Sequence, residues 1–238
     1  MKSRIWGLLA VTAMILTAGV HSASAETVSL RVSSGAFSCT MADNGLAASG
    51  GCTGSDSVNT LGAISWSTSI GDWGLTANTG VGSSLLGAGS LDLAFVGLHS
   101  APAPSTLTIE FTQVSTSPSF SSFTLGIGGT LGSGATASYA AFVDNSNTAF
   151  GKPGGGQIGS TLVFVTPGPF SGSTSGTGGG SGALYSLTQV VTLTSNGLGI
   201  QISSGDATVS APEPTSLVLL GAGLTGIAAA FRRKSRSK

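Results

Sequence analysis

Apolar and polar residues alternate along much of the chain between residues 28 and 209. In the run 107–111, for example, Leu107, Ile109 and Phe111 are separated by a threonine and a glutamate. A period of two places the apolar side chains on one face of a β-strand, which predicts half-buried antiparallel strands. The same reasoning predicts further strands at 28–32, 64–70, 73–77, 91–95, 120–127, 137–143, 161–166, 185–194 and 198–209.

Clusters of glycine, serine, asparagine and proline separate these runs, at 80–89, 128–134, 151–159 and 171–182. Breakers at this spacing, without a convincing amphipathic helix, predict one all-β domain over residues 26–210, an antiparallel, jelly-roll-like β-sandwich. A β-solenoid is the alternative that the glycine and serine content allows, although no repeat period is present. The stretch 171–182 consists of serine, threonine and glycine alone, and we expect it to form a flexible loop.

The ends of the chain differ from its middle in charge. Only 8% of the 238 residues are charged, and most of the basic ones lie at the two termini. Between residues 26 and 211, Arg31 and Lys152 are the basic residues, against eight acidic ones. This balance argues against a nucleic-acid-binding protein. Residues 1–25 combine basic residues, an apolar stretch and a closing Ala23-Ser24-Ala25, which predicts a signal peptide cleaved by signal peptidase after Ala25.

The C-terminal segment, residues 211–238, has three parts. Pro212-Glu213-Pro214 comes first, then an uncharged run over 215–231, then a tail that begins with Arg232, Arg233 and Lys234. As a helix the uncharged run would reach about 25 Å, close to the thickness of a bilayer core. The positive-inside bias would keep the basic tail in the cytoplasm, so residues 26–211 would lie outside the inner membrane.

This three-part order resembles the PEP-CTERM sorting signal of bacterial proteins. The resemblance implies that a membrane-embedded exosortase recognises the segment and removes it near Pro212, Glu213 and Pro214. It also implies transient anchoring in the inner membrane and delivery to the cell surface, outer envelope or exopolysaccharide matrix. An ordinary tail anchor, with the proline pair as a stiff linker, is the alternative for the same residues.

Cys39 and Cys52 are the two cysteines of the chain. Because an exported protein meets an oxidising compartment, we expect a disulfide between them, worth about 3 kcal/mol on the chain-entropy model. A zinc site would need more ligands than these two and the distant His99.

Few residues invite a catalytic hypothesis. His99 ends a predicted strand, where we expect it on the surface, and no serine lies in a Gly-x-Ser-x-Gly elbow. Glu110 should point outward from its strand, and Glu26 begins the mature chain, so neither is placed for a glycosidase. Lys152 lies in a glycine-rich stretch that lacks the ending of a phosphate-binding loop.

We therefore expect no catalytic residue, no bound metal and no cofactor, with weak calcium binding near Asp144 as an open alternative. Among the tryptophans, Trp66 alternates in phase with a predicted core, whereas Trp73 follows a turn and is the candidate for stacking on a sugar. The sequence predicts a non-enzymatic surface or matrix protein with a structural or adhesive role. A carbohydrate-binding adhesin or lectin-like module is the alternative, followed by a secreted hydrolase.

Overall fold

The computed structural model describes residues 27–86, 89–116, 120–178 and 184–212, together with Gly223 and Thr225. The predicted signal peptide and nearly all of the apolar run over 215–231 lie outside the described residues. Within the part that is described, no helix is both long and apolar enough to cross a membrane.

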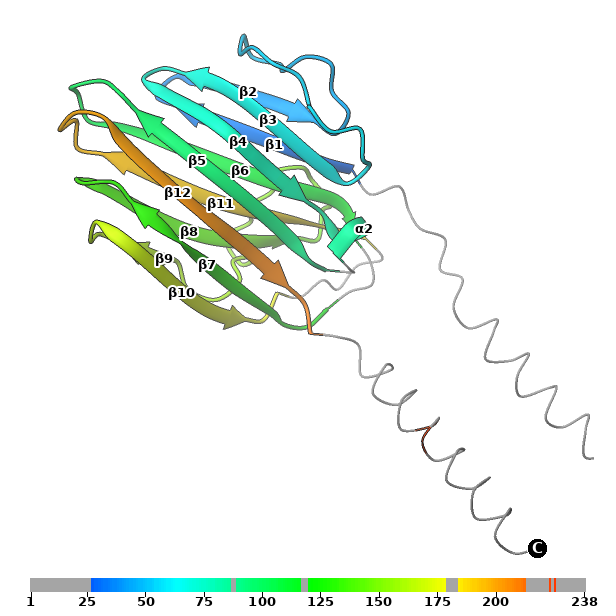
Figure 1. Ribbon diagram of the computed structural model, residues 1–238. Helices are drawn as coiled ribbons and strands as arrows, with labels where there is room; N and C mark the ends of the chain where they lie inside the picture. Colours follow the sequence, from blue (N-terminus) through cyan, green and yellow to red (C-terminus); the bar gives the residue numbers. More distant parts are fainter. Residues whose placement is uncertain are drawn as a thin grey trace, which may run out of the picture.

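Within the described ranges, twelve antiparallel strands form two six-stranded sheets that pack face to face (Figure 1). Sheet A has the order β2-β1-β6-β11-β8-β9. Its strands are β1 (Thr27–Ser34), β2 (Phe37–Ala42), β6 (Ser105–Thr116), β8 (Ala135–Asp144), β9 (Leu162–Phe164) and β11 (Tyr185–Ser195). The antiparallel pairing confirms the predicted β-sandwich and rules out the solenoid alternative.

Sheet B has the order β10-β7-β12-β5-β4-β3. Its strands are β3 (Ala63–Ile70), β4 (Trp73–Val81), β5 (Leu91–His99), β7 (Phe123–Leu131), β10 (Gly168–Gly176) and β12 (Gln201–Ser210). One short helix, α2 (Ser83–Leu86), follows β4. The last strand among the described residues, β12, lies in the interior of this sheet and pairs with both β5 and β7.

The core fills the space between the sheets with the apolar members of each alternating strand. The burial of β5 alternates strictly over its nine residues, as a strand with one face on the core should. Trp66, Tyr139 and Phe111 are among the largest side chains that are fully buried. The Tyr139 hydroxyl on β8 donates a hydrogen bond of 2.9 Å to the carbonyl oxygen of Thr208 on β12, which joins the two sheets.

The predicted disulfide between Cys39 and Cys52 is present, with the two Cα atoms 5.9 Å apart. It ties the connection between β2 and β3 to the edge of sheet A. The same connection covers the edge of sheet B, where Ser57 N donates to Ser65 O at 2.8 Å and the Trp66 indole donates to Thr53 O at 3.0 Å. Covering of this kind hides backbone groups that would otherwise be open to another chain.

The prediction of a flexible loop over 171–182 is wrong for its first half. Residues 171–176 belong to β10, which pairs with β7 over its whole length. The serine and glycine composition suggested flexibility, but these residues are ordered by hydrogen bonds to the partner strand and by a phenylalanine ring packed over them. A Cβ on Gly172 would lie 3.0 Å from the Phe164 ring, so that ring occupies the space above the glycine. The pattern also gave no sign of β2.

A substitution at Gly205 on β12 tests the packing between strands. A Cβ at this position would lie 2.6 Å from the Phe95 ring and 2.9 Å from the carbonyl oxygen of Gly128. We expect Gly205→Ala to lower the free energy of unfolding by about 1–3 kcal/mol, because the overpacked ring and backbone must shift. Urea denaturation measures this, with Gly154→Ala as the control because no atom lies within 4 Å of its Cβ position. Equal losses in the two variants would contradict the packing argument.

Candidate functional site

The start of the C-terminal segment is held against the folded domain. Ala211 follows β12 directly, and its N–H donates a hydrogen bond of 3.1 Å to the carbonyl oxygen of Gly89. Pro212 is exposed. The segment therefore leaves the sandwich from an interior strand of sheet B, with no linker between fold and motif. Glu213, Pro214 and the basic residues Arg232, Arg233 and Lys234 lie outside the described residues.

The structure corrects the prediction that His99 lies on the surface. Its side chain is fully buried, and its Nδ1 atom lies 2.8 Å from the Ser195 hydroxyl, which also accepts a hydrogen bond from Gly197 N at 3.0 Å. The ring packs on Trp73, with centroids 4.9 Å apart. His99 ends β5 at an inward-facing position, so this histidine–serine pair lies inside the sandwich.

Trp73 is likewise not the sugar-stacking residue that its position after a turn suggested. It is 2% exposed, and its indole N–H donates a hydrogen bond of 3.0 Å to the Ser105 hydroxyl of the opposite sheet. The strand register places Trp73 opposite His99, with both side chains facing the core. Trp66 is buried as predicted. Neither side chain is open to a saccharide.

Glu110 is also buried, although its position in the alternating pattern of β6 places it on the outer face of sheet A, as the sequence predicted. The connection between β8 and β9 folds over the outer face of sheet A, where Phe150 N donates to the Thr112 hydroxyl at 3.2 Å. Beneath this connection the Glu110 carboxylate pairs with Arg31 and Lys152. Burial acts to raise the pKa of Glu110, but hydrogen bonds from the two cations and their charges lower it overall. The Arg31 guanidinium in turn lies 4.1 Å from the centroid of the Phe150 ring.

Asp144, the residue considered for calcium, caps a turn. Its carboxylate accepts hydrogen bonds from Ser146 N at 2.8 Å and Thr148 N at 3.4 Å, an arrangement that an Asx-type turn explains without an ion. Across the described ranges, no group of three or more histidine, cysteine, aspartate or glutamate side chains is arranged to hold a metal ion.

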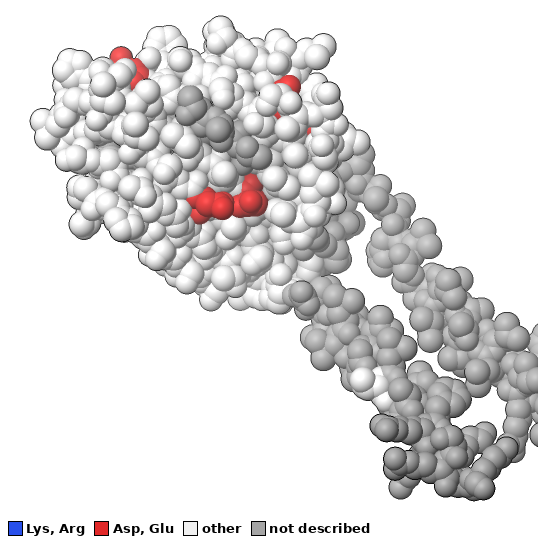
Figure 2. Space-filling view, in the orientation of Figure 1, with Lys and Arg blue, Asp and Glu red and all other residues white. Residues whose placement is uncertain are grey.

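The sequence analysis missed a carboxylate pair on the outer face of sheet B. The acidic residues of β5 and β12 are Asp92 and Asp206, and Figure 2 shows a red patch over these strands with no blue side chain in view. Burial, a hydrogen bond with Asp206 and the negative charge of that residue raise the pKa of Asp92 to about 7. The two positions are 114 residues apart in the sequence, so only the strand order brings them together.

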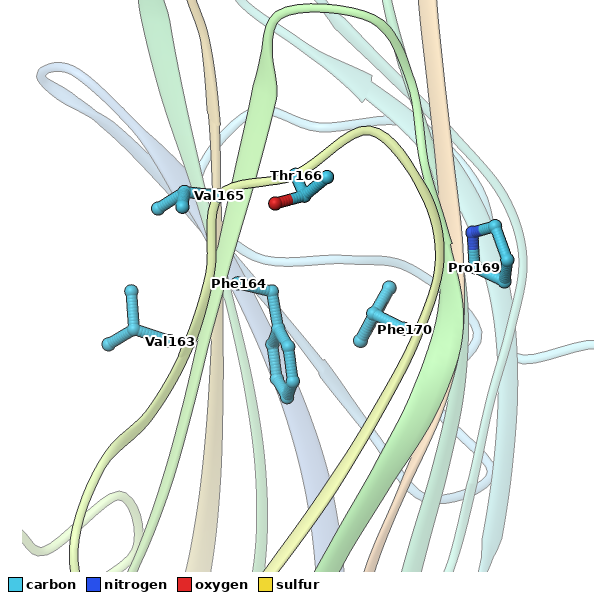
Figure 3. A pocket seen from close by; sticks show the side chains of 6 residues that line it. All are labelled: Val163, Phe164, Val165, Thr166, Pro169 and Phe170. Carbon is cyan, nitrogen blue, oxygen red and sulfur yellow. The ribbon is translucent and has the colours of Figure 1, made fainter.

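A shallow cleft of about 210 Å³ lies between β9 and β10, at one side of the sandwich. Figure 3 shows the Phe164 and Phe170 side chains pointing into the space between the two strands, whereas Val163 and Val165 point away from it. The two phenylalanine rings are 4.5 Å apart between centroids and inclined at 40°. The cleft thus presents apolar surface, with the Thr166 hydroxyl as its side-chain polar group.

The carboxylate pair predicts a pH dependence of stability. In the folded protein Asp92 keeps its proton up to about pH 7, whereas an unfolded aspartate loses it near pH 4. Unfolding between these values releases a proton, so we expect the free energy of unfolding of the wild type to fall, relative to that of Asp92→Asn, as the pH rises from 4 to 7.

Urea denaturation at intervals across this range measures the difference. The control is Asp72→Asn, which changes an exposed aspartate in the turn between β3 and β4. A stability difference between wild type and Asp92→Asn that stays constant from pH 4 to 7 would refute the prediction that Asp92 is protonated in the folded protein.

Among solved structures, the chain is similar to several β-rich domains, all at low sequence identity. TmCBM61, solved in complex with β-1,4-galactotriose, is 8% identical, with a TM-score of 0.36 over 50% of this chain and 71% of its own. The adhesin domain of Epf from Streptococcus pyogenes is 10% identical, with a TM-score of 0.42 over 77% of this chain and 58% of its own. The Family 16 Carbohydrate Binding Module-2 is 11% identical, with a TM-score of 0.26 over 48% and 80%.

No curated protein sequence matches the chain significantly. The family comparison identifies the C-terminal segment, because residues 210–234 match the model of the PEP-CTERM protein-sorting motif. The match begins at Ser210, the last residue of β12, and includes Pro212, Glu213 and Pro214 as well as Arg232, Arg233 and Lys234. This chain therefore carries a PEP-CTERM protein-sorting motif directly after an antiparallel β-sandwich.

Proposed function

We propose that this is a non-enzymatic bacterial protein that an exosortase sorts to the outer envelope or the extracellular polymer matrix, where the sandwich has a structural or adhesive role. The observation that carries the proposal is the sorting motif over residues 210–234, which follows the last strand without a linker. In this scheme signal peptidase removes residues 1–25, and the run over 215–231 holds the protein in the inner membrane until the exosortase acts.

The side chains of the motif have separate roles in this scheme. The prolines at 212 and 214 keep the backbone extended and place Glu213 as a fixed negative charge for the processing enzyme. Arg232, Arg233 and Lys234 hold the tail at the cytoplasmic face of the membrane. Ala211 keeps its hydrogen bond to Gly89, so the cut end would stay close to the folded domain.

The described side chains support a binding or structural role rather than catalysis. Two side chains considered for catalysis, those of His99 and Glu110, are buried and contact neighbouring side chains. Exposed positions of β10 and β12 are largely serine and threonine. Such a surface suits hydrogen bonding to the hydroxyl groups of a polysaccharide matrix.

Replacement of Pro212, Glu213 and Pro214 by alanine tests the sorting proposal. We expect the variant to remain in the inner membrane with Lys238 still attached, because the processing enzyme loses its recognition sequence. Intact mass, measured separately on inner membrane, outer envelope and extracellular polymer from the native host, reports both location and processing.

The matched control is Pro102→Ala with Pro104→Ala, a second proline pair in the exposed loop after β5. It should be sorted like the wild type, with a mass that begins at Glu26 and ends near Pro212 to Pro214, alone or with an adduct. Normal release of the alanine variant of residues 212–214 would overturn the proposal, and a full-length wild-type protein in the inner membrane would favour the tail anchor.

A second candidate function is glycan binding, which the cleft between β9 and β10 favours. Its phenylalanine rings offer apolar surface for the face of a sugar ring, and the Thr166 hydroxyl lies at the same cleft. The buried tryptophans cannot serve this purpose, so the candidate depends on Phe164 and Phe170.

Phe170→Ala tests this candidate through retention of the protein in gels that contain the host exopolysaccharide. Glycan binding at the cleft predicts a retention loss of about fivefold or more, since an aromatic contact of this kind contributes about 1 kcal/mol or more. Phe37→Ala is the control, because Phe37 is 63% exposed on β2, away from β9 and β10. Unchanged retention of a folded Phe170→Ala protein would eliminate the cleft as a glycan site.

A further inference from the structure

The point at which the chain leaves the sandwich limits how far the domain can be from a membrane. Ala211 is fixed to Gly89, and the uncharged run begins at Thr215, four residues later. Four extended residues span at most about 14 Å. The polar headgroup layer alone occupies about 5–7 Å on each side of a bilayer core. If Thr215 lies at the edge of the core, the end of the sandwich that carries Ala211 lies at the headgroup surface.

Three exposed leucines lie at this same end. Figure 1 shows α2 beside the end of the sandwich at which β12 finishes. On α2, Leu85 is 50% exposed and Leu86 is 46% exposed, while Leu61, in the turn before β3, is 73% exposed. We call these three residues the exit leucines.

Backbone contacts hold the exit leucines together. Gly82 N donates a hydrogen bond of 2.7 Å to Gly62 O, which joins the turn of Leu61 to the start of α2. A Cβ on Gly62 would lie 1.9 Å from the Ser84 hydroxyl and 3.8 Å from Leu85 Cγ, so the two segments pack tightly. The apolar side chains therefore project from one fixed surface.

The charges of the described residues favour lipid contact through apolar side chains rather than through attraction to anionic headgroups. The basic residues in the described ranges are Arg31 and Lys152, and both are paired with Glu110 on the outer face of sheet A. Next to the exit leucines lies Asp43, whose carboxylate accepts a hydrogen bond of 2.8 Å from Gly62 N. Basic side chains that would bind acidic lipid are therefore absent from the described part of this end.

We propose that the exit leucines form a membrane-contact surface on which the folded sandwich rests, end-on, against lipid while the sorting segment is still attached. This inference rests on the proposed function, because it requires residues 215–231 to be in the bilayer. The contact would hold the Pro212 to Pro214 region at the membrane surface, within reach of a membrane-embedded processing enzyme. Removal of the segment would leave only the leucine contact, which is too small to retain the protein.

A pair of serine positions at opposite ends of the sandwich tests the proposal. Ser84 is exposed between the exit leucines, and Ser100 is exposed just beyond the far end of β5, about 30 Å away along nine strand residues. The full chain carries Ser84→Cys or Ser100→Cys with a fluorescent label and is reconstituted in phosphatidylcholine vesicles that contain a headgroup nitroxide. We expect loss of most of the fluorescence at position 84 and none at position 100, with little effect of salt.

A second set of variants separates leucine contact from simple tethering. A flexible glycine-serine linker inserted after Ala211 frees the domain to move away from the membrane. In this background we expect the label at position 84 to remain partly quenched, and Leu85→Ser with Leu86→Ser to abolish the quenching. The matched control is Leu198→Ser with Ile200→Ser, which removes exposed apolar side chains from the opposite end and should have no effect.

Two outcomes would overturn the membrane-contact proposal, provided that the chain still floats with the vesicles. One is equal fluorescence at positions 84 and 100. The other is quenching in the linker background that Leu85→Ser with Leu86→Ser leaves unchanged. Quenching at position 84 that requires added exosortase would assign the surface to that enzyme instead of lipid and would also overturn it. A chain that does not associate with the vesicles would refute the anchoring step of the proposed function as well, so the two failures are distinguishable.

Discussion

The position of β12 is the constraint on which most of this structure depends. This strand, the last one in the described part of the chain, lies in the interior of sheet B, hydrogen-bonded to β5 and β7. Sheet B is therefore incomplete until the residues just before the sorting motif have been added. The carbonyl of Thr208 on this strand also accepts the hydrogen bond from Tyr139 that joins the sheets. Completion of the fold and presentation of the sorting motif thus use the same ten residues.

A second constraint is that the polar residues with the most reactive chemistry are used to hold the sandwich together. Glu110 fixes the connection between β8 and β9 to the outer face of sheet A through Arg31 and Lys152. His99 and Ser195 pair inside the sandwich rather than at its surface. In each case a charged or ionisable side chain is buried with a partner, which is the condition under which burial is tolerated. The exposed positions carry many serine and threonine residues, together with Asp206 and apolar side chains such as Phe37.

The two ends of the sandwich consequently differ. One end carries Ala211, the exposed Pro212 and the exit leucines, and the other carries the loops after β5 and β11. A protein that arrives at its destination after loss of the sorting segment would have the second end and the faces of both sheets free for contacts with a matrix. The cleft between β9 and β10 lies at the side of the sandwich, so it would stay open before and after processing.

The amino-acid sequence by itself determined most of the strand pattern, the disulfide and the sorting motif, because a period of two, a pair of cysteines in an exported chain and a three-part terminal segment are local features. It could not determine which strands become neighbours. Only the tertiary structure decided that Trp73 and His99 face the core, that a connecting segment covers Glu110, and that β10 is ordered. It also brought Asp92 next to Asp206. Each of these depends on contacts between residues far apart in the chain, and an alternating pattern specifies the face of a side chain but not what covers that face.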